Sequence, residues 1–170
     1  FDHNGGYESL KDKIEIKQVI EDSNDKVNVD YPFYLLLSER EAKDTNDSSI
    51  ISYFTYDHFT YLFMGDASKQ IEKQLMATYD LKADVVKVGH HGSNTSSDSD
   101  FLDSLDCKIA LISAGYKNKY GHPSVETLKT LETLHINTLC TSDCGSIAIY
   151  SLFHLSFLVT NDGMFGIIWT

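Results

Sequence analysis

The spacing of apolar residues changes near residue 68, from runs typical of strands to an alternation of helices and strands. Before this point, runs rich in β-branched and aromatic residues predict strands, and one short stretch predicts a helix. The expected helix covers 7–14, and the expected strands cover 14–20, 32–37, 49–56 and 59–65. Asp57 and His58 separate the last two strands, which predicts a tight hairpin.

After residue 68, the expected helices cover 69–79, 99–105 and 124–134, and the expected strands cover 83–89, 108–113, 137–141, 145–151, 155–160 and 164–169. Ser124 is the expected N-cap of the third helix, with Thr127 at the position that a capping box would use. The pattern predicts an α/β chain with mixed sheets and substantial antiparallel content. Since no linker or repeat divides it, we expect one domain over 1–170, in which the assignment of 151–170 stays open.

The composition is that of an ordinary soluble globular domain, with 42% hydrophobic and 23% charged residues among 170. Lys and Arg number 14 against 25 Asp and Glu, which gives a net charge of -11 and argues against a sequence-independent nucleic-acid coat. Any phosphate substrate would therefore be held locally, and bound divalent metal is an economical source of positive charge. No apolar run approaches the roughly 18 residues of a membrane span, so we expect a soluble chain.

Acidic and imidazole side chains gather where predicted strands end or helices begin. Asp66 follows one predicted strand, His90 and His91 follow another, and His122 precedes a helix. Loops at strand ends deliver side chains to a shared cleft, so these groups can converge on metal. Singly, each has a plain structural explanation, such as a helix cap or a turn, and only the combination favours a site.

Asp2 and His3 open the chain in a similar setting, before the first expected helix, although a terminal dipeptide alone is more often frayed surface. Mixed nitrogen and oxygen donors suit Zn²⁺, Mn²⁺ or iron rather than Ca²⁺. Two such ions, which Asp66 could bridge, clamp the oxygens of a displacement at phosphorus and lower the pKa of bound water. This chemistry requires no side-chain nucleophile.

Two polar segments near these residues have a functional and a structural interpretation. Ser93, Thr95 and Ser96 are neutral donors suited to phosphate oxygens, or else parts of a solvated loop. Tyr116 and Tyr120 flank Lys117 and Lys119, a combination typical of contacts with single-stranded nucleic acid, although a surface loop is the simpler interpretation.

Three motifs, MGDAS at 64–68, ADVVKVGHHGSNTS at 83–96 and YGHPSVETL at 120–128, together resemble the metallo-β-lactamase-fold domain of ComEC-type competence DNA-uptake proteins. The resemblance runs from the opening DHNGG to about residue 150. It implies a metallo-β-lactamase-like αββα sandwich with two divalent metal positions for Mn²⁺ or Zn²⁺. It further implies a DNase that degrades the non-imported strand, attached to a membrane channel on the extracellular face of the cell membrane.

The first metal motif of that family has the form His-x-Asp-x-Asp-His before Gly-Gly, and FDHNGG looks like its second half. Its first His and Asp, and the strands before them, would lie upstream of Phe1, so we expect one metal position to be incomplete. By resemblance, the metal ligands are Asp2, His3, Asp66 and one of His91 and His90, with His91 favoured. The same resemblance gives catalytic roles to Asp66, His90 and His122: His90 would touch the phosphate, and His122 would contact substrate or protonate the leaving group.

Two other functions stay open. The same fold could hydrolyse another phosphodiester, such as a choline-phosphate decoration or a small nucleotide. Alternatively, an incomplete metal site could mark a catalytically silent binding module. Strands missing from the sheet would expose an edge or an apolar face, which predicts a homodimer or aggregation there.

Overall fold

A mixed six-stranded sheet forms the centre of the computed structural model, which describes residues 6–20, 25–37, 45–152, 155–161, 163 and 165–168. The strands follow chain order across the sheet: β1 (Phe33–Leu36), β2 (Ile51–Tyr56), β3 (Phe59–Phe63), β4 (Val85–Lys87), β5 (Ile109–Ile112) and β6 (Asn137–Cys140). The first three strands pair antiparallel, and β3 to β6 pair parallel. The expected α/β class with a mixed sheet is confirmed, including the hairpin at Asp57 and His58.

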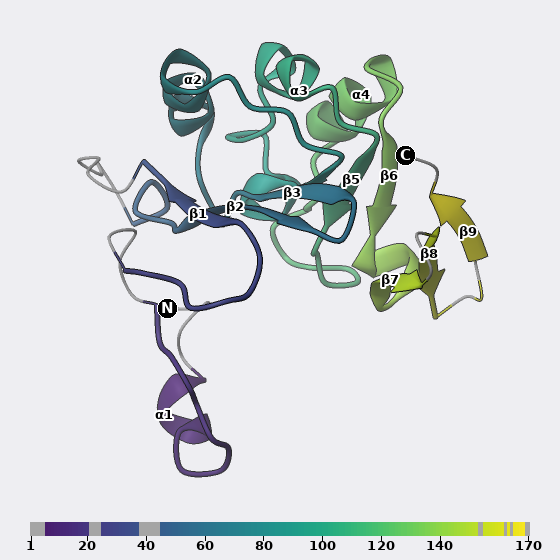
Figure 1. Ribbon diagram of the computed structural model, residues 1–170. Coiled ribbons are helices and arrows are strands. Elements are labelled where there is room, and N and C mark those ends of the chain that lie inside the picture. The colour runs from purple at the N-terminus through teal and green to yellow at the C-terminus, as the bar shows by residue number, and fades with distance from the viewer. Residues whose placement is uncertain are drawn as a thin grey trace.

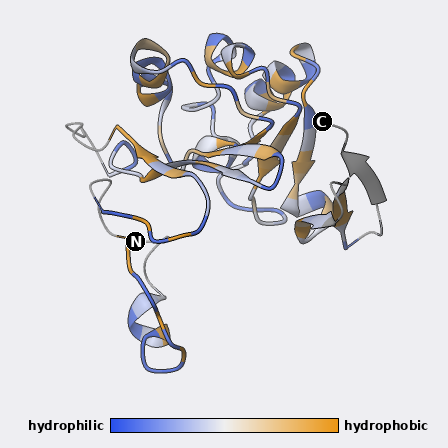
Figure 2. Cartoon of the chain, in the orientation of Figure 1, coloured by the Kyte–Doolittle hydropathy of each residue, from blue (hydrophilic) through white to orange (hydrophobic). Residues whose placement is uncertain are grey.

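Three helices lie on one face of this sheet, above it in Figure 1: α2 (Lys69–Thr78), α3 (Ser99–Leu105) and α4 (Val125–Thr133). Each helix links two neighbouring parallel strands, which need a crossover connection. The predicted cap of α4 is confirmed, because Ser124 Oγ accepts a hydrogen bond from the Thr127 amide at 3.1 Å. Hydrophobic residues concentrate in the strands, and the loops around them are largely hydrophilic (Figure 2).

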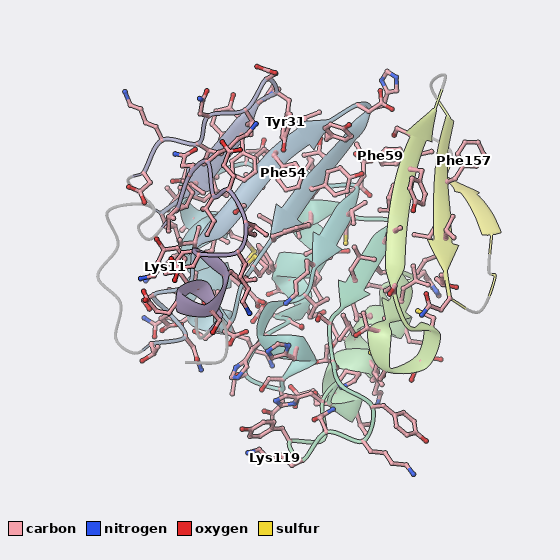
Figure 3. The ribbon with its side chains drawn as sticks, turned by 90° about the horizontal axis from the view of Figure 1, so that it is seen from below. Lys11, Tyr31, Phe54, Phe59, Lys119 and Phe157 are labelled. Carbon is pink, nitrogen blue, oxygen red and sulfur yellow. The ribbon has the colours of Figure 1, made fainter. Side chains whose placement is uncertain are left out.

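A second, antiparallel sheet contains β7 (Ile147–Leu152), β8 (Leu155–Thr160) and β9 (Phe165–Ile168) and follows the short helix α5 (Thr141–Cys144). It packs against the other face of the main sheet, where Ile147 and Leu158 join a cluster with Phe59 and Tyr61. An aromatic groove continues beside this contact, and Figure 3 shows Tyr31 and Phe54 on that face. Self-association through an exposed face or edge stays a prediction, which sedimentation velocity would check.

The predicted strand over 14–20 is wrong. This segment has no strand structure in the described part of the chain, and the helix before it, α1 (Tyr7–Leu10), covers only the first half of the expected 7–14. The side chains of Ile14 and Val19 are 56% and 40% exposed. Alternation alone does not make a strand, because the backbone needs a partner strand and the apolar side chains need a surface to cover.

Candidate functional site

The carboxyl ends of three neighbouring parallel strands bring four of the predicted site residues together. Asp66 follows β3, His90 and His91 follow β4 in a short 3-10 turn (Gly89–Gly92), and His122 lies in the connection from β5 to α4. Since the ends of parallel strands meet at one edge of a sheet, the loops share one location. Asp2 and His3, the other two predicted ligands, lie outside the described residues.

Gly65 sets the position of Asp66. Its φ of +57° and the contact that a Cβ would make with Ser49 Cβ at 2.7 Å both require glycine. The Gly65 carbonyl accepts a hydrogen bond from the His90 amide at 3.0 Å, and the Asp66 amide donates to Ser49 Oγ at 2.9 Å. These bonds tie the loop after β3 to the loop after β4 and hold the Asp66 carboxylate in a buried position, only 8% exposed.

His90 and His91 both adopt left-handed backbone conformations, with φ of +47° and +55°. Two consecutive non-glycine residues in this region are unfavourable by about 1–2 kcal/mol each. Such strain persists where the surrounding structure imposes it, and it occurs often at functional sites. Here the conformation directs the two neighbouring imidazoles to different partners.

The imidazole of His91 lies between a backbone carbonyl and Asp66. Its Nδ1 is 2.7 Å from the Ser113 carbonyl oxygen, which only accepts, so Nδ1 carries the proton and the neutral ring has its lone pair on Nε2. Nε2 is 3.7 Å from Asp66 Oδ1, beyond hydrogen-bond distance. Two acceptor atoms face each other there, an arrangement that a cation or a proton on Nε2 stabilises.

This pair fits a transition metal in both distance and chemistry. Ligand atoms about 2.1 Å from one tetrahedral ion lie about 3.4 Å apart, close to the observed separation. A metal-binding histidine also typically donates its other ring N–H to a carbonyl or carboxylate, as His91 does to Ser113. Among the residues that the structure describes, no group of three or more His, Cys, Asp or Glu side chains is arranged to hold a metal ion.

His90 faces a different set of groups. Its Nδ1 is 3.2 Å from Thr95 Oγ1, and its ring lies 5.7 Å from the ring of His122. Burial, and then the nearby His90 and His91, lower the pKa of His122, while Asp66 opposes this shift. The neutral form of His122 is therefore favoured at neutral pH.

The hydroxyls that follow the histidines support the loop as well as bordering the site. Ser96 is 1% exposed, and its hydroxyl, which has one proton to donate, lies 2.8 Å from the Gly89 carbonyl oxygen and 3.0 Å from the Ser93 carbonyl oxygen. Ser93 Oγ lies 3.0 Å from the exposed Thr95 hydroxyl, which also contacts His90. Thr95 borders the site most openly, whereas the contacts of Ser96 describe a positioning role; contact of these residues with substrate stays a prediction.

Sequence reasoning missed two charged residues. Lys87 is the one charged residue in the run VVKVG; burial lowers its pKa, and Asp66 opposes that shift. Glu72 on α2 is 1% exposed and accepts hydrogen bonds from the amides of Ser97 and Asp98, both at 2.7 Å. For Lys87, a lysine inside an otherwise apolar strand is a signal that the sequence offers. For Glu72 the sequence offers no such signal, because the two residues that donate hydrogen bonds to it are 25 and 26 positions away.

Glu72 makes stability depend on pH. Burial raises its pKa from 4.5 to about 7, although the two amide donors favour the charged form. When the pKa of a carboxyl group is higher in the folded state than in the unfolded state, its protonated form stabilises the fold. This stabilisation is fully present below the unfolded-state pKa of 4.5 and is lost as the pH rises through the folded-state pKa of about 7. We expect the free energy of unfolding to fall between about pH 5 and pH 7.5, and Glu72→Gln to remove this component. Urea titrations across this range measure it.

The control for that prediction is Glu132→Gln, which changes an exposed carboxylate on α4. This variant should keep the pH dependence of the wild type. Equal pH slopes for Glu72→Gln and the wild type would contradict the assignment of that component to Glu72.

The chain is similar to parts of several longer proteins. It is 36% identical over 120 residues to ComE operon protein 3 of Bacillus subtilis (strain 168), a match that covers 69% of this chain and 16% of that protein. It is 34% identical over 121 residues to Competence protein ComA of Neisseria gonorrhoeae, with 70% and 17% covered. These matches support a competence-related family. No family model matches the chain.

A third relative, Recombination protein 2 of Haemophilus influenzae, is 37% identical over 70 residues, which cover 41% of this chain and 9% of that protein. The chain thus spans less than a fifth of the length of these relatives. In the described part of the chain, no helix combines the length and apolar character that crossing a bilayer requires.

Proposed function

We propose that this chain is a metallo-β-lactamase-like, metal-dependent phosphodiester hydrolase that acts on DNA in competence uptake. The observation that carries the proposal is the His91 and Asp66 pair, in which a lone-pair nitrogen faces a buried carboxylate oxygen at 3.7 Å. The similarity to competence proteins supports DNA as the substrate. Attachment to a membrane channel, at the extracellular face of the cell membrane, and degradation of the non-imported strand are parts of the same proposal.

Asp66 and His91 would hold the metal, Mn²⁺ or Zn²⁺, and Asp2 and His3 are further ligands by the resemblance described above. A divalent ion supplies Lewis-acid polarisation of a phosphoryl oxygen and makes water more acidic at neutral pH. The Ser113 carbonyl keeps the His91 ring oriented. The buried position of Asp66 excludes much of the water that would otherwise weaken its interaction with a cation.

The other two histidines would position the substrate. The proposal places His90 against a phosphate oxygen, with Thr95 orienting its ring through Nδ1. Protonation of the leaving group would require the protonated form of His122, whereas contact with the substrate is also open to the neutral imidazole. Since its pKa is lowered, a neutral imidazole that contacts the substrate is the role that its surroundings favour.

The experiment is a calorimetric titration of metal-stripped protein with Mn²⁺ and then Zn²⁺, followed by hydrolysis of bis(4-nitrophenyl) phosphate and of DNA with and without EDTA. We expect at least one bound ion per chain and hydrolysis that EDTA abolishes. Binding of metal without hydrolysis of either substrate would favour the silent module. Hydrolysis of the small diester without cleavage of DNA would favour choline-phosphate or a small nucleotide as the natural substrate.

A further inference from the structure

A loop in which two tyrosines flank two lysines extends from the candidate site. This tyrosine–lysine loop covers 115–121, between β5 and α4. Tyr116 and Tyr120 are 74% and 67% exposed, far more than aromatic side chains that serve a core. Lys117 Nζ lies 5.2 Å from the centre of the Tyr116 ring, and Lys119 Nζ lies 4.8 Å from that of Tyr120. Both tyrosines are therefore exposed to solvent, and each ring has an ammonium group over it.

Asn118 holds this loop in shape. Its Nδ2 donates to the carbonyl of Gly115 at 2.9 Å and to that of His122 at 2.5 Å. Its Oδ1 accepts a hydrogen bond from the His122 amide at 3.0 Å. One side chain thus joins the two ends of the loop, so that the ring positions are defined before any ligand arrives and binding orders less of the protein.

Ring contacts connect the loop to the site. The Tyr120 ring stacks on His122, with centroids 5.9 Å apart and planes inclined by 18°. His122 in turn lies 5.7 Å from the His90 ring. Figure 3 shows Lys119 beyond the carboxyl ends of the parallel strands, far from Tyr31 and Phe54. A strand whose phosphate reached the histidines would therefore place its neighbouring nucleotides along this loop.

We propose that the tyrosine–lysine loop binds single-stranded nucleic acid, with a base stacked on Tyr116, adjacent phosphates held by Lys117 and Lys119, and Tyr120 joining the loop to the site through its stack on His122. The proposal rests on the proposed function and names its substrate class. Stacking on aromatic side chains with cationic neighbours is the general mode for sequence-independent binding of single strands. The chain has a net charge of -11, so two lysines at the site provide a local attraction for phosphate that opposes the overall negative charge.

The lysines also distinguish this ligand from a choline-phosphate group. A quaternary ammonium ion binds over aromatic faces that are free of competing cations. Here an ammonium group already lies near each exposed ring, so a second cation would be repelled. The combination of ring and ammonium suits a base joined to a phosphate.

The test measures binding of a fluorescent oligothymidylate of about fifteen nucleotides by anisotropy, in EDTA so that the strand stays intact. Tyr116→Ala is the sharper variant, because no ring contact links Tyr116 to His122 among the described residues. We expect it to weaken binding about fivefold or more, and Tyr116→Phe to retain the wild-type affinity. Lys117→Gln should reduce the slope of log affinity against log salt by about 0.7.

The control is Tyr150→Ala, which removes a tyrosine on β7 that is 60% exposed and lies outside the loop. Its affinity for the oligonucleotide should equal that of the wild type, and unfolding midpoints would verify that every variant is folded. No binding by the wild type, or equal binding by Tyr116→Ala, would overturn the inference.

Measuring the hydrolysis of bis(4-nitrophenyl) phosphate by the wild type distinguishes failure of the loop proposal from failure of the proposed hydrolase function. Hydrolysis of this diester together with binding that is insensitive to Tyr116 would refute the loop and leave the hydrolase standing. Binding that depends on Tyr116 without hydrolysis of any diester would refute the hydrolase and support a nucleic-acid binding loop.

Discussion

Replacing Asp66 with Asn is expected to weaken the binding of Mn²⁺ or Zn²⁺ more than a hundredfold and to reduce phosphodiester hydrolysis at least as much. Asn keeps the size of the side chain but removes the charge that faces His91 Nε2 at 3.7 Å. Loss of an outer-shell partner alone costs about 10–100-fold in affinity or activity, so loss of a ligand costs more. Calorimetric titration of metal-stripped protein measures the affinity.

The hairpin between β2 and β3 supplies a matched control. Asp57 Oδ1 lies 3.4 Å from His58 Nε2, so Asp57→Asn also removes a carboxylate that faces an imidazole, away from the carboxyl ends of the parallel strands. This variant should bind metal like the wild type. If Asp57→Asn and Asp66→Asn had equal effects, or if Asp66→Asn kept full affinity, the proposed metal position would be wrong.

Replacing Leu131 with Ala is expected to lower the free energy of unfolding by about 2–5 kcal/mol. Leu131 lies on α4, is fully buried at 0% exposure and joins the core cluster between the helices and the sheet. Truncation removes apolar burial and leaves a cavity that the neighbouring strands fill only in part. Urea unfolding followed by circular dichroism measures the loss.

Leu128 allows the same substitution on the same helix at a position that is 40% exposed. Leu128→Ala should cost less than about 1 kcal/mol, because it creates no closed cavity. Similar losses for the two variants would show that α4 does not pack against the sheet as described. Helix propensity cannot cause the difference, since both variants introduce the same residue.

Local patterns predicted most elements within a few residues. The helix expected over 99–105 matches α3, and Asp98 caps it by accepting a hydrogen bond from the Asp100 amide. The hairpin at 57–58 and the cap of α4 also follow from neighbouring residues, because turns and caps are local interactions. The expected strand over 14–20 failed for the opposite reason: a strand depends on a partner that a local pattern does not reveal.

The candidate site, like the fold, was predictable from local sequence only in part. The sequence by itself determined that Asp66, His90, His91 and His122 stand at strand ends or helix starts, where loops converge. Only the tertiary structure decided that His91 faces Asp66 while His90 faces Thr95 and His122, because left-handed backbone conformations and the Ser113 carbonyl set the ring directions. It also decided the burial of Glu72, whose partners come from a loop 25 residues away. Periodicity records which positions are apolar, whereas side-chain direction and distant hydrogen bonds arise when separate segments pack together.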